Sequence, residues 1–306
     1  MKLFIYKTIL YGIGILLLLF VFINRLGSYI DYFYLKFTTP KASSMVIGDS
    51  RSFQGIQPEL FDSLVSNSFY DKPLYNYSFT IAQFSYDSIN YITMKRKHNE
   101  KANNGLYILS IHPWVLSEPK EGIRVHYNKI SNVAPHTMSN PNKNPNIEYI
   151  FKHFDDFNFK GVFRRNSVLH KTGWLENRNL PKNEQEYIFN CNIQYNMYQG
   201  FSKDWKPSDE KIKYLKLMIT YFKSHGTVIL VQMPIDEKLK AIERQYWKDF
   251  DEVAVSISKE LQVVYLNYNE SNTNFEFYDG NHLNREGGKD FSIDLAKKIH
   301  ETPLHH

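Results

Sequence analysis

The chain opens with its longest uninterrupted apolar segment. Residues 8–23 carry no charged side chain, and residues 3–6 extend the segment if the Lys7 side chain reaches the lipid headgroups. Together these residues approach the roughly 20 that a helix needs to cross a bilayer. A cleaved signal peptide is the alternative, but residues 24–31 lack the small-residue cleavage site that such a peptide requires. We therefore predict an uncleaved transmembrane anchor over residues 1–25.

Basic residues flank this segment on both sides. Lys2 and Lys7 precede it, and three more basic residues follow it before residue 43. Because the first charges lie close to the apolar segment and most of the chain follows it, we expect a cytoplasmic amino end and an exported domain. Residues 26–42 are then a juxtamembrane connector, and residues 43–303 form the exported domain.

Beyond residue 43, short apolar runs alternate with segments of helical periodicity. The runs predicted as strands are residues 45–47, 74–79, 106–111, 227–231 and 263–266. A first helix is predicted to begin at Pro58. Four more helical segments are predicted over residues 82–98, 207–226, 236–261 and 284–300. This alternation indicates an α/β fold whose five-stranded, mostly parallel sheet is covered by helices on both faces.

Residues 114–206 interrupt the alternation. They are rich in Asn, Pro and aromatic residues, as in residues 139–146, and contain only short amphipathic pieces such as residues 147–154. Long inserts in folds of this class usually lie over the functional edge of the sheet, which predicts a lid or a polymer-recognition insert. The alternative is a poorly ordered excursion on the surface.

Composition excludes several classes of function. The 37 Lys and Arg against 32 Asp and Glu give a net charge of only +5, and the two signs are interspersed. That balance does not indicate a nucleic-acid partner, although it tolerates an anionic polymer or headgroup surface. Cys191 is the single cysteine, so neither an internal disulfide nor a cysteine metal site is predicted. The 11 histidines are scattered and no Gly-rich phosphate loop is present, so we expect no metal and no cofactor.

One strand end carries a candidate nucleophile. The run of residues 45–47 stops on Gly48-Asp49-Ser50. Because parallel sheets bind substrates at the carboxyl ends of their strands, Ser50 is delivered to the functional edge of the sheet. The alternative is a turn serine that caps the following helix, since Gly, Asp and Ser are common where a strand enters a turn.

A second motif supplies the groups that would activate such a serine. Asp279 and His282 stand three residues apart, directly before the last predicted helix. His282 is a candidate general base, and Asp279 is a candidate partner that holds its tautomer. The alternatives are a surface histidine that caps the last helix and an Asp-Gly turn formed with Gly280.

Together, Gly48-Asp49-Ser50 and Asp279-x-x-His282 resemble the SGNH (GDSL-type) hydrolase superfamily over about residues 42–300. The resemblance implies a three-layer, flavodoxin-like SGNH hydrolase fold and a Ser50, Asp279 and His282 triad. Arg51 stands where the name-giving pattern has Leu. Such variants resemble membrane-anchored members that handle acyl groups on cell-envelope polymers, which implies a domain in a bacterial periplasm or on the outer cell face.

The resemblance also implies an oxyanion hole, from which this sequence departs. The backbone N–H of Ser50 is its first donor. Ser78 stands at the position of the usual glycine, and its backbone N–H can replace that glycine's. His112 stands where the family has an Asn, and a neutral imidazole can donate one hydrogen bond. A structural role at the strand end is the alternative for His112. Arg51 and Trp114 would border the pocket and contact an anionic or sugar group.

These expectations define a function with open alternatives. The chain is predicted to be a serine hydrolase or O-acyltransferase that acts on an acylated glycan or envelope polymer. Water and a sugar hydroxyl are both open as the acyl acceptor, because both use the same triad. A membrane-bound acyltransferase is the further partner expected if the acyl group arrives from the membrane. A catalytically inactive SGNH-like scaffold or glycan-binding protein is the competing prediction.

Overall fold

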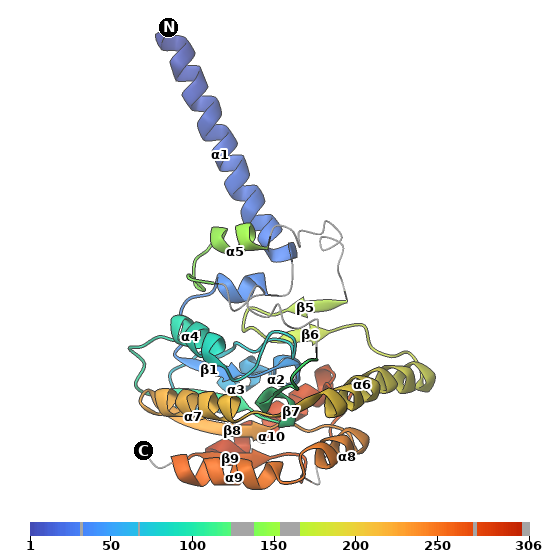
Figure 1. Ribbon diagram of the computed structural model, residues 1–306. Coiled ribbons are helices and arrows are strands. Elements are labelled where there is room, and N and C mark those ends of the chain that lie inside the picture. The colour runs from blue at the N-terminus through green and yellow to red at the C-terminus, as the bar shows by residue number, and fades with distance from the viewer. Residues whose placement is uncertain (31–32, 67, 124–137, 154–165, 272–273, 302–306) are drawn as a thin grey trace.

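A long helix precedes an α/β domain in this chain (Figure 1). The computed structural model describes residues 1–30, 33–66, 68–123, 138–153, 166–271 and 274–301. Helix α1 spans Lys2–Ile30, and its first 21 residues, Lys2–Phe22, are long and apolar enough to cross a membrane. A signal sequence near the amino end would meet the same criteria. The predicted apolar helix is therefore confirmed, whereas its retention and its orientation stay predictions.

The predicted connector is in part a piece of the domain. The 3-10 helix η1 spans Tyr34–Phe37. Phe33, Tyr34 and Phe37 are each at least 93% buried and belong to the main hydrophobic core. The Lys36 side chain is fully buried, and its Nζ donates to the carbonyl oxygens of Asn76 (2.5 Å) and Gly173 (2.7 Å). The boundary of the folded domain thus lies before Phe33 rather than at residue 43.

Five parallel strands form the central sheet in the order β2-β1-β3-β8-β9. They span Leu74–Asn76 (β2), Ser44–Ile47 (β1), Gly105–Ser110 (β3), Gly226–Gln232 (β8) and Val264–Asn267 (β9). This is the doubly wound order in which the winding direction reverses between β1 and β3. The predicted five-stranded, flavodoxin-like α/β fold is confirmed, and the reversal marks where such sheets bind ligands.

Helices cover both faces of the sheet because its strands are apolar on both sides. In β1, Met45 and Ile47 pack into one core cluster, and Val46 packs into the other. The first cluster receives residues from α4 (Ser88–Lys97), α7 (Asp209–Lys223) and α9 (Phe250–Leu261). The second receives residues from α3 (Pro58–Leu64) and α10 (Arg285–Glu301). Because successive side chains of a strand point to opposite faces, helices pack on both sides of the sheet, which gives three layers.

The region predicted as one helix over residues 236–261 is two helices. Helix α8 spans Glu237–Tyr246, and α9 begins at Phe250. Trp247 and Phe250 are both buried, with their rings edge to face and 5.3 Å apart. The chain leaves helical geometry at Trp247, whose φ of −134° and ψ of 85° end α8.

The insert at residues 114–206 holds more regular structure than its sequence predicts. The described elements are η2 (Pro113–Leu116), β4 (Ser117–Pro119), α5 (Ile147–Lys152), β5 (Ser167–Leu169), β6 (Leu175–Asn177), α6 (Glu184–Asp204) and β7 (Trp205–Pro207). Strand β4 pairs antiparallel with β7, and β5 pairs antiparallel with β6. The 21-residue helix α6 packs against α8 at the side of the sheet.

Candidate active site

Ser50 stands at the carboxyl end of β1, as the sequence predicts. Gly48 ends the strand, and a Cβ at this position would lie 2.6 Å from the Ser110 Cβ, so only glycine fits. Helix α2 (Ser50–Gly55) begins directly afterwards, and Asp49 caps it by accepting the backbone N–H of Arg51 (3.2 Å). The first turn of a helix leaves backbone N–H groups without helical acceptors, and the Ser50 N–H is one of them.

The loop that carries Asp279 and His282 is folded around the Asp279 carboxylate. Its Oδ1 accepts the backbone N–H groups of Asn281 (3.0 Å) and His282 (2.8 Å). Gly280 lies at φ +76°, and a Cβ there would be 2.3 Å from Asp236 Oδ2. The turn therefore requires glycine both for its backbone conformation and for space.

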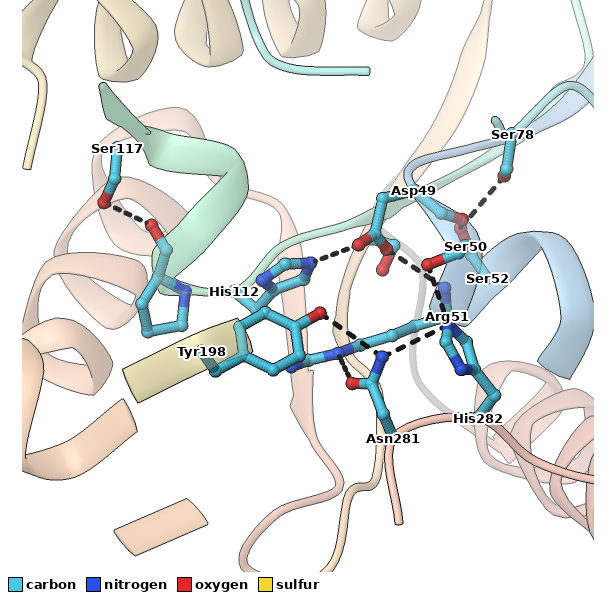
Figure 2. A network of polar contacts seen from close by, with 12 residues as sticks. Asp49, Ser50, Arg51, Ser52, Ser78, His112, Ser117, Tyr198, Asn281 and His282 are labelled. Atoms are coloured by element: carbon cyan, nitrogen blue, oxygen red, sulfur yellow. Dashed lines mark hydrogen bonds and ion pairs between the residues drawn. The ribbon is translucent and has the colours of Figure 1, made fainter. Parts of the chain in front are cut away.

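Ser50, His282 and Asp279 meet in one hydrogen-bonded chain, and Figure 2 shows Ser50 and His282 facing each other. His282 Nε2 lies 2.9 Å from Ser50 Oγ, and His282 Nδ1 lies 2.8 Å from Asp279 Oδ2. Because an ionised carboxylate only accepts hydrogen bonds, Nδ1 carries the proton and Nε2 presents its lone pair to the Ser50 hydroxyl. This is the tautomer in which a histidine can take the proton of a serine.

A fourth group at the site is an amide that the sequence analysis missed. Asn281 Nδ2 lies 3.1 Å from His282 Nε2, the same nitrogen that contacts Ser50. The orientation of the amide is fixed because Asn281 Oδ1 accepts from Arg51 Nε (2.8 Å). Its position between Asp279 and His282 in the sequence was the signal available, because a short loop brings its intervening side chains to the same site.

Arg51 supports the site from inside the molecule. Its guanidinium is 1% exposed and donates from Nη2 to Glu243 Oε1 at 2.7 Å. Burial works to lower the pKa of Arg51, and the Glu243 carboxylate outweighs it, so the pKa is raised. Arg51 thus links the nucleophile motif to Asn281 and α8. The predicted contact of Arg51 with an anionic substrate has no support in this geometry.

The Trp114 side chain is also buried and does not lie on the open surface of the site. It is 1% exposed and stacks on Tyr246 with ring centroids 4.4 Å apart. Tyr198 of α6 lies against the same indole at 5.3 Å. Trp114 therefore packs α6 against α8, and its predicted contact with a sugar has no support in this geometry.

The backbone N–H of Ser78, a predicted oxyanion donor, is engaged elsewhere. The backbone N–H of Ser78 donates to Asn76 Oδ1 (3.1 Å), and its hydroxyl accepts from Ser52 Oγ (2.9 Å). Ser78 is fully buried, so its N–H is not available to a substrate. The expectation for Ser78 is corrected because a side chain two residues earlier already occupies the donor.

His112 faces the first motif from the end of β3. Its Nε2 lies 3.0 Å from Asp49 Oδ2, both side chains are fully buried, and the contact has the distance but not the angle of a hydrogen bond. Burial works to raise the pKa of Asp49, but His112, Arg51 and His282 outweigh it, so the pKa is lowered. His112 therefore orders the Asp49 cap of α2, and its donation to an oxyanion stays a prediction.

The insert contributes residues to the site through α6. Gln194 Nε2 donates to Asp279 Oδ2 (3.1 Å), so that oxygen receives both Gln194 and His282. Tyr198 OH lies 3.3 Å from Asn281 Nδ2. On the other side, the Tyr278 ring lies parallel to the His282 imidazole, with ring centroids 5.7 Å apart. Part of the predicted insert is thus in contact with the loop of residues 279–282, named the triad loop after its predicted role. Ser50 is only 7% exposed.

A cleft of about 690 Å³ opens beside the same loop, between the start of α8 and the loop after β9. Its lining includes Asp236, Phe277 and Asn284, which flank the triad loop in space or in sequence. Among the described residues, no three His, Cys, Asp or Glu side chains are grouped so as to hold a metal ion.

Comparisons with known proteins give a distant likeness. No family model and no curated protein matches the chain. A solved structure of Est24, a carbohydrate acetylesterase from Sinorhizobium meliloti, is 10% identical with a TM-score of 0.37, over 84% of this chain and 98% of that one. Two structures of an aryl esterase from M. smegmatis, one inhibitor-bound and one native, are 9% identical with a TM-score of 0.36, over the same shares. At this similarity the sheet order and the site geometry carry the interpretation.

Proposed function

We propose that this chain is a membrane-anchored serine esterase of the SGNH type. The observation that carries the proposal is the chain of contacts from Ser50 Oγ through His282 to Asp279, at the point where the winding of the sheet reverses. Two segments 232 positions apart meet there with the tautomer that proton transfer requires. A scaffold without catalysis has no need of that arrangement.

The proposed reaction has two halves. Ser50 Oγ attacks the ester carbonyl carbon as its proton passes to His282 Nε2, which forms a tetrahedral oxyanion. Collapse breaks the bond to the leaving alcohol, which takes the proton back from His282, and an acyl-Ser50 remains. An incoming hydroxyl then attacks the acyl carbon while His282 takes its proton, and the acyl product leaves as Ser50 is restored.

Asn281 fits the role that Ser78 does not. While His282 is neutral, the Asn281 amide points at the Nε2 lone pair in competition with the Ser50 hydroxyl. Once Nε2 is protonated it can no longer accept, so the amide proton is released at the moment the oxyanion forms. We assign the oxyanion to this amide and to the Ser50 backbone N–H.

The substrate proposal rests on the anchor and on the closed site. Helix α1 would hold the domain outside the cytoplasmic membrane, where the ester-linked acyl groups of a glycan or envelope polymer are within reach. A nucleophile that is 7% exposed favours a small acyl group over a long chain. Water or a sugar hydroxyl is the proposed acceptor, with a membrane-bound acyl donor as partner in the transferase case.

The test uses the full chain in detergent. We expect a fluorophosphonate to label the wild type and p-nitrophenyl acetate to be hydrolysed, with both lost in Ser50→Ala and with hydrolysis lost in His282→Ala. Ser63→Ala, at an exposed serine of α3, is the matched control and should retain both activities. Absence of labelling in the wild type would contradict the esterase proposal and favour the catalytically inactive scaffold. Faster turnover on addition of a sugar would favour a transferase.

A further inference from the structure

Helix α5 presents a small apolar face to the outside. Ile147 and Phe151, four residues apart on one side of the helix, are 50% and 79% exposed. Phe151 is the most exposed large apolar side chain among the described residues outside α1. The opposite side of α5 is firmly packed, because Tyr149 is fully buried and stacks on Phe37 at 4.9 Å. The exposed face therefore belongs to a helix that is fixed in place.

This face lies at the root of the anchor. The backbone N–H of Asn146 donates to the Tyr34 hydroxyl (3.2 Å), and Asn146 Nδ2 donates to the Phe37 carbonyl oxygen (2.9 Å). These contacts tie α5 to η1, and Tyr34 is only four residues from Ile30, where α1 ends. Figure 1 shows α5 beside the lower end of α1.

The distances bring this face within reach of a bilayer. If Lys2–Phe22 fills the hydrocarbon core, the remaining eight residues of α1 rise about 12 Å beyond it. The headgroup layer takes up about 5–8 Å of that rise. Four Cα–Cα steps lead from Ile30 at the end of α1 to Tyr34 at the start of η1. They can span up to about 14 Å, which is enough for the domain to tilt onto the surface.

A basic groove continues the surface beside α5. It has a volume of about 450 Å³, and its lining includes Lys41, Lys95 and Arg96 against the single carboxylate of Glu100. One wall of the groove is the segment of residues 139–142, which Glu148 of α5 holds by accepting the backbone N–H groups of residues 139 (2.7 Å) and 140 (2.8 Å). The groove and the apolar face therefore share one rigid support.

We propose that α5 and this groove form a membrane-docking surface that rests on an anionic phospholipid bilayer, with Phe151 and Ile147 in the interface and phosphate headgroups in the groove. Continuity with α1 and the excess of cations select this occupant. Aromatic side chains favour the headgroup layer, and cations near an anionic leaflet are attracted to it. Docking would fix the distance and the orientation of the active site relative to the membrane.

The test places a polarity-sensitive thiol-reactive fluorophore on Phe151→Cys in the full chain, reconstituted in vesicles of phosphatidylcholine and phosphatidylglycerol. Wild-type protein gives the background from Cys191, which is 3% exposed. Phe189→Cys is the matched control, because Phe189 is 65% exposed on α6, away from α1 (Figure 1). We expect a shift to shorter wavelength and quenching by spin-labelled lipids at residue 151 only. Equal responses at residues 151 and 189 would overturn the proposal.

Charge reversal tests the groove separately. Each cation near an anionic surface contributes about fivefold to its attraction. Lys41→Glu combined with Lys95→Glu should therefore lower the docked-to-undocked ratio of labelled Phe151→Cys by about tenfold or more. Vesicles of phosphatidylcholine alone should have the same effect on the unreversed protein. If quenching persists in both cases, the groove does not bind headgroups. If quenching is absent under all conditions, the membrane-docking proposal is overturned.

Discussion

Replacement of Asp279 by Asn tests the tautomer at the centre of the site. The new amide keeps an oxygen for the backbone N–H groups of Asn281 and His282, so the loop should stay folded. In place of Oδ2 it presents an NH₂ group to His282 Nδ1, which must then accept. The imidazole proton moves to Nε2, which faces Ser50 and can no longer take the hydroxyl proton. Gln194, the other donor to Oδ2, can turn its amide to accept from the new NH₂.

The expected loss of activity is large because His282 Nε2 would carry a proton and could no longer act as a base. A wrong tautomer in a serine triad lowers kcat by about 10⁴, which corresponds to about 5.4 kcal/mol of transition-state stabilisation. The assay is p-nitrophenyl acetate hydrolysis by Asp279→Asn and by Gln194→Ala, which removes the other donor but keeps the carboxylate. We expect Gln194→Ala to lose far less than Asp279→Asn. A loss below tenfold in a stably folded Asp279→Asn would refute the assignment of Asp279 as the partner of His282.

Three further outcomes are expected. Asn281→Ala should lower kcat by about 10²–10³ while the KM changes little, because an oxyanion donor acts mainly in the transition state. An unchanged kcat would show that Asn281 is not the oxyanion donor. Gly280→Ala should abolish turnover and destabilise the fold by about 1–2 kcal/mol, since it forces a left-handed side chain against Asp236. Gly200→Ala, which has no atom within 4 Å, should instead be neutral or stabilising in thermal unfolding. Burial lowers the pKa of Lys97 from 10.5 to about 7. The unfolded chain therefore binds more protons than the folded one between these values, and stability should rise with pH there. Lys97→Met should flatten that slope in denaturant titrations at pH 7, 8 and 9, and parallel slopes would contradict the shift.

The sheet was predictable because its strands are short apolar runs with clear punctuation. Helix α6 was not predictable, because its sequence has no clear apolar pattern at helical spacing. Only three of its residues, Cys191, Tyr198 and Phe201, are buried, and the rest of its 21 positions are largely polar. A stripe that thin leaves little periodic signal. The helix is held instead by its contacts with α8 and by hydrogen bonds to the triad loop, which local sequence does not encode.

The meeting of Ser50, His282 and Asp279 was predictable because two short motifs carry all three groups. The supporting contacts were not, since they join positions that are distant in sequence. Arg51 and Glu243, which form an ion pair, are 192 positions apart. The Ser78 N–H donates to the Asn76 side chain, and whether that side chain can reach it depends on the geometry of the turn. Sequence patterns identify which groups can react, whereas the partners that occupy or release each donor depend on the packed structure.

If α1 anchors the chain as proposed, the packing of η1 into the core limits how the domain can be released. Loss of the chain before residue 43 would remove Phe33, Tyr34 and Phe37 from the core and leave two backbone carbonyl groups without Lys36 Nζ as their donor. A soluble form shed in that way would not hold its fold. Release from the proposed anchor that preserves the fold has to sever the chain upstream of Phe33, in the short stretch between the apolar segment and the core.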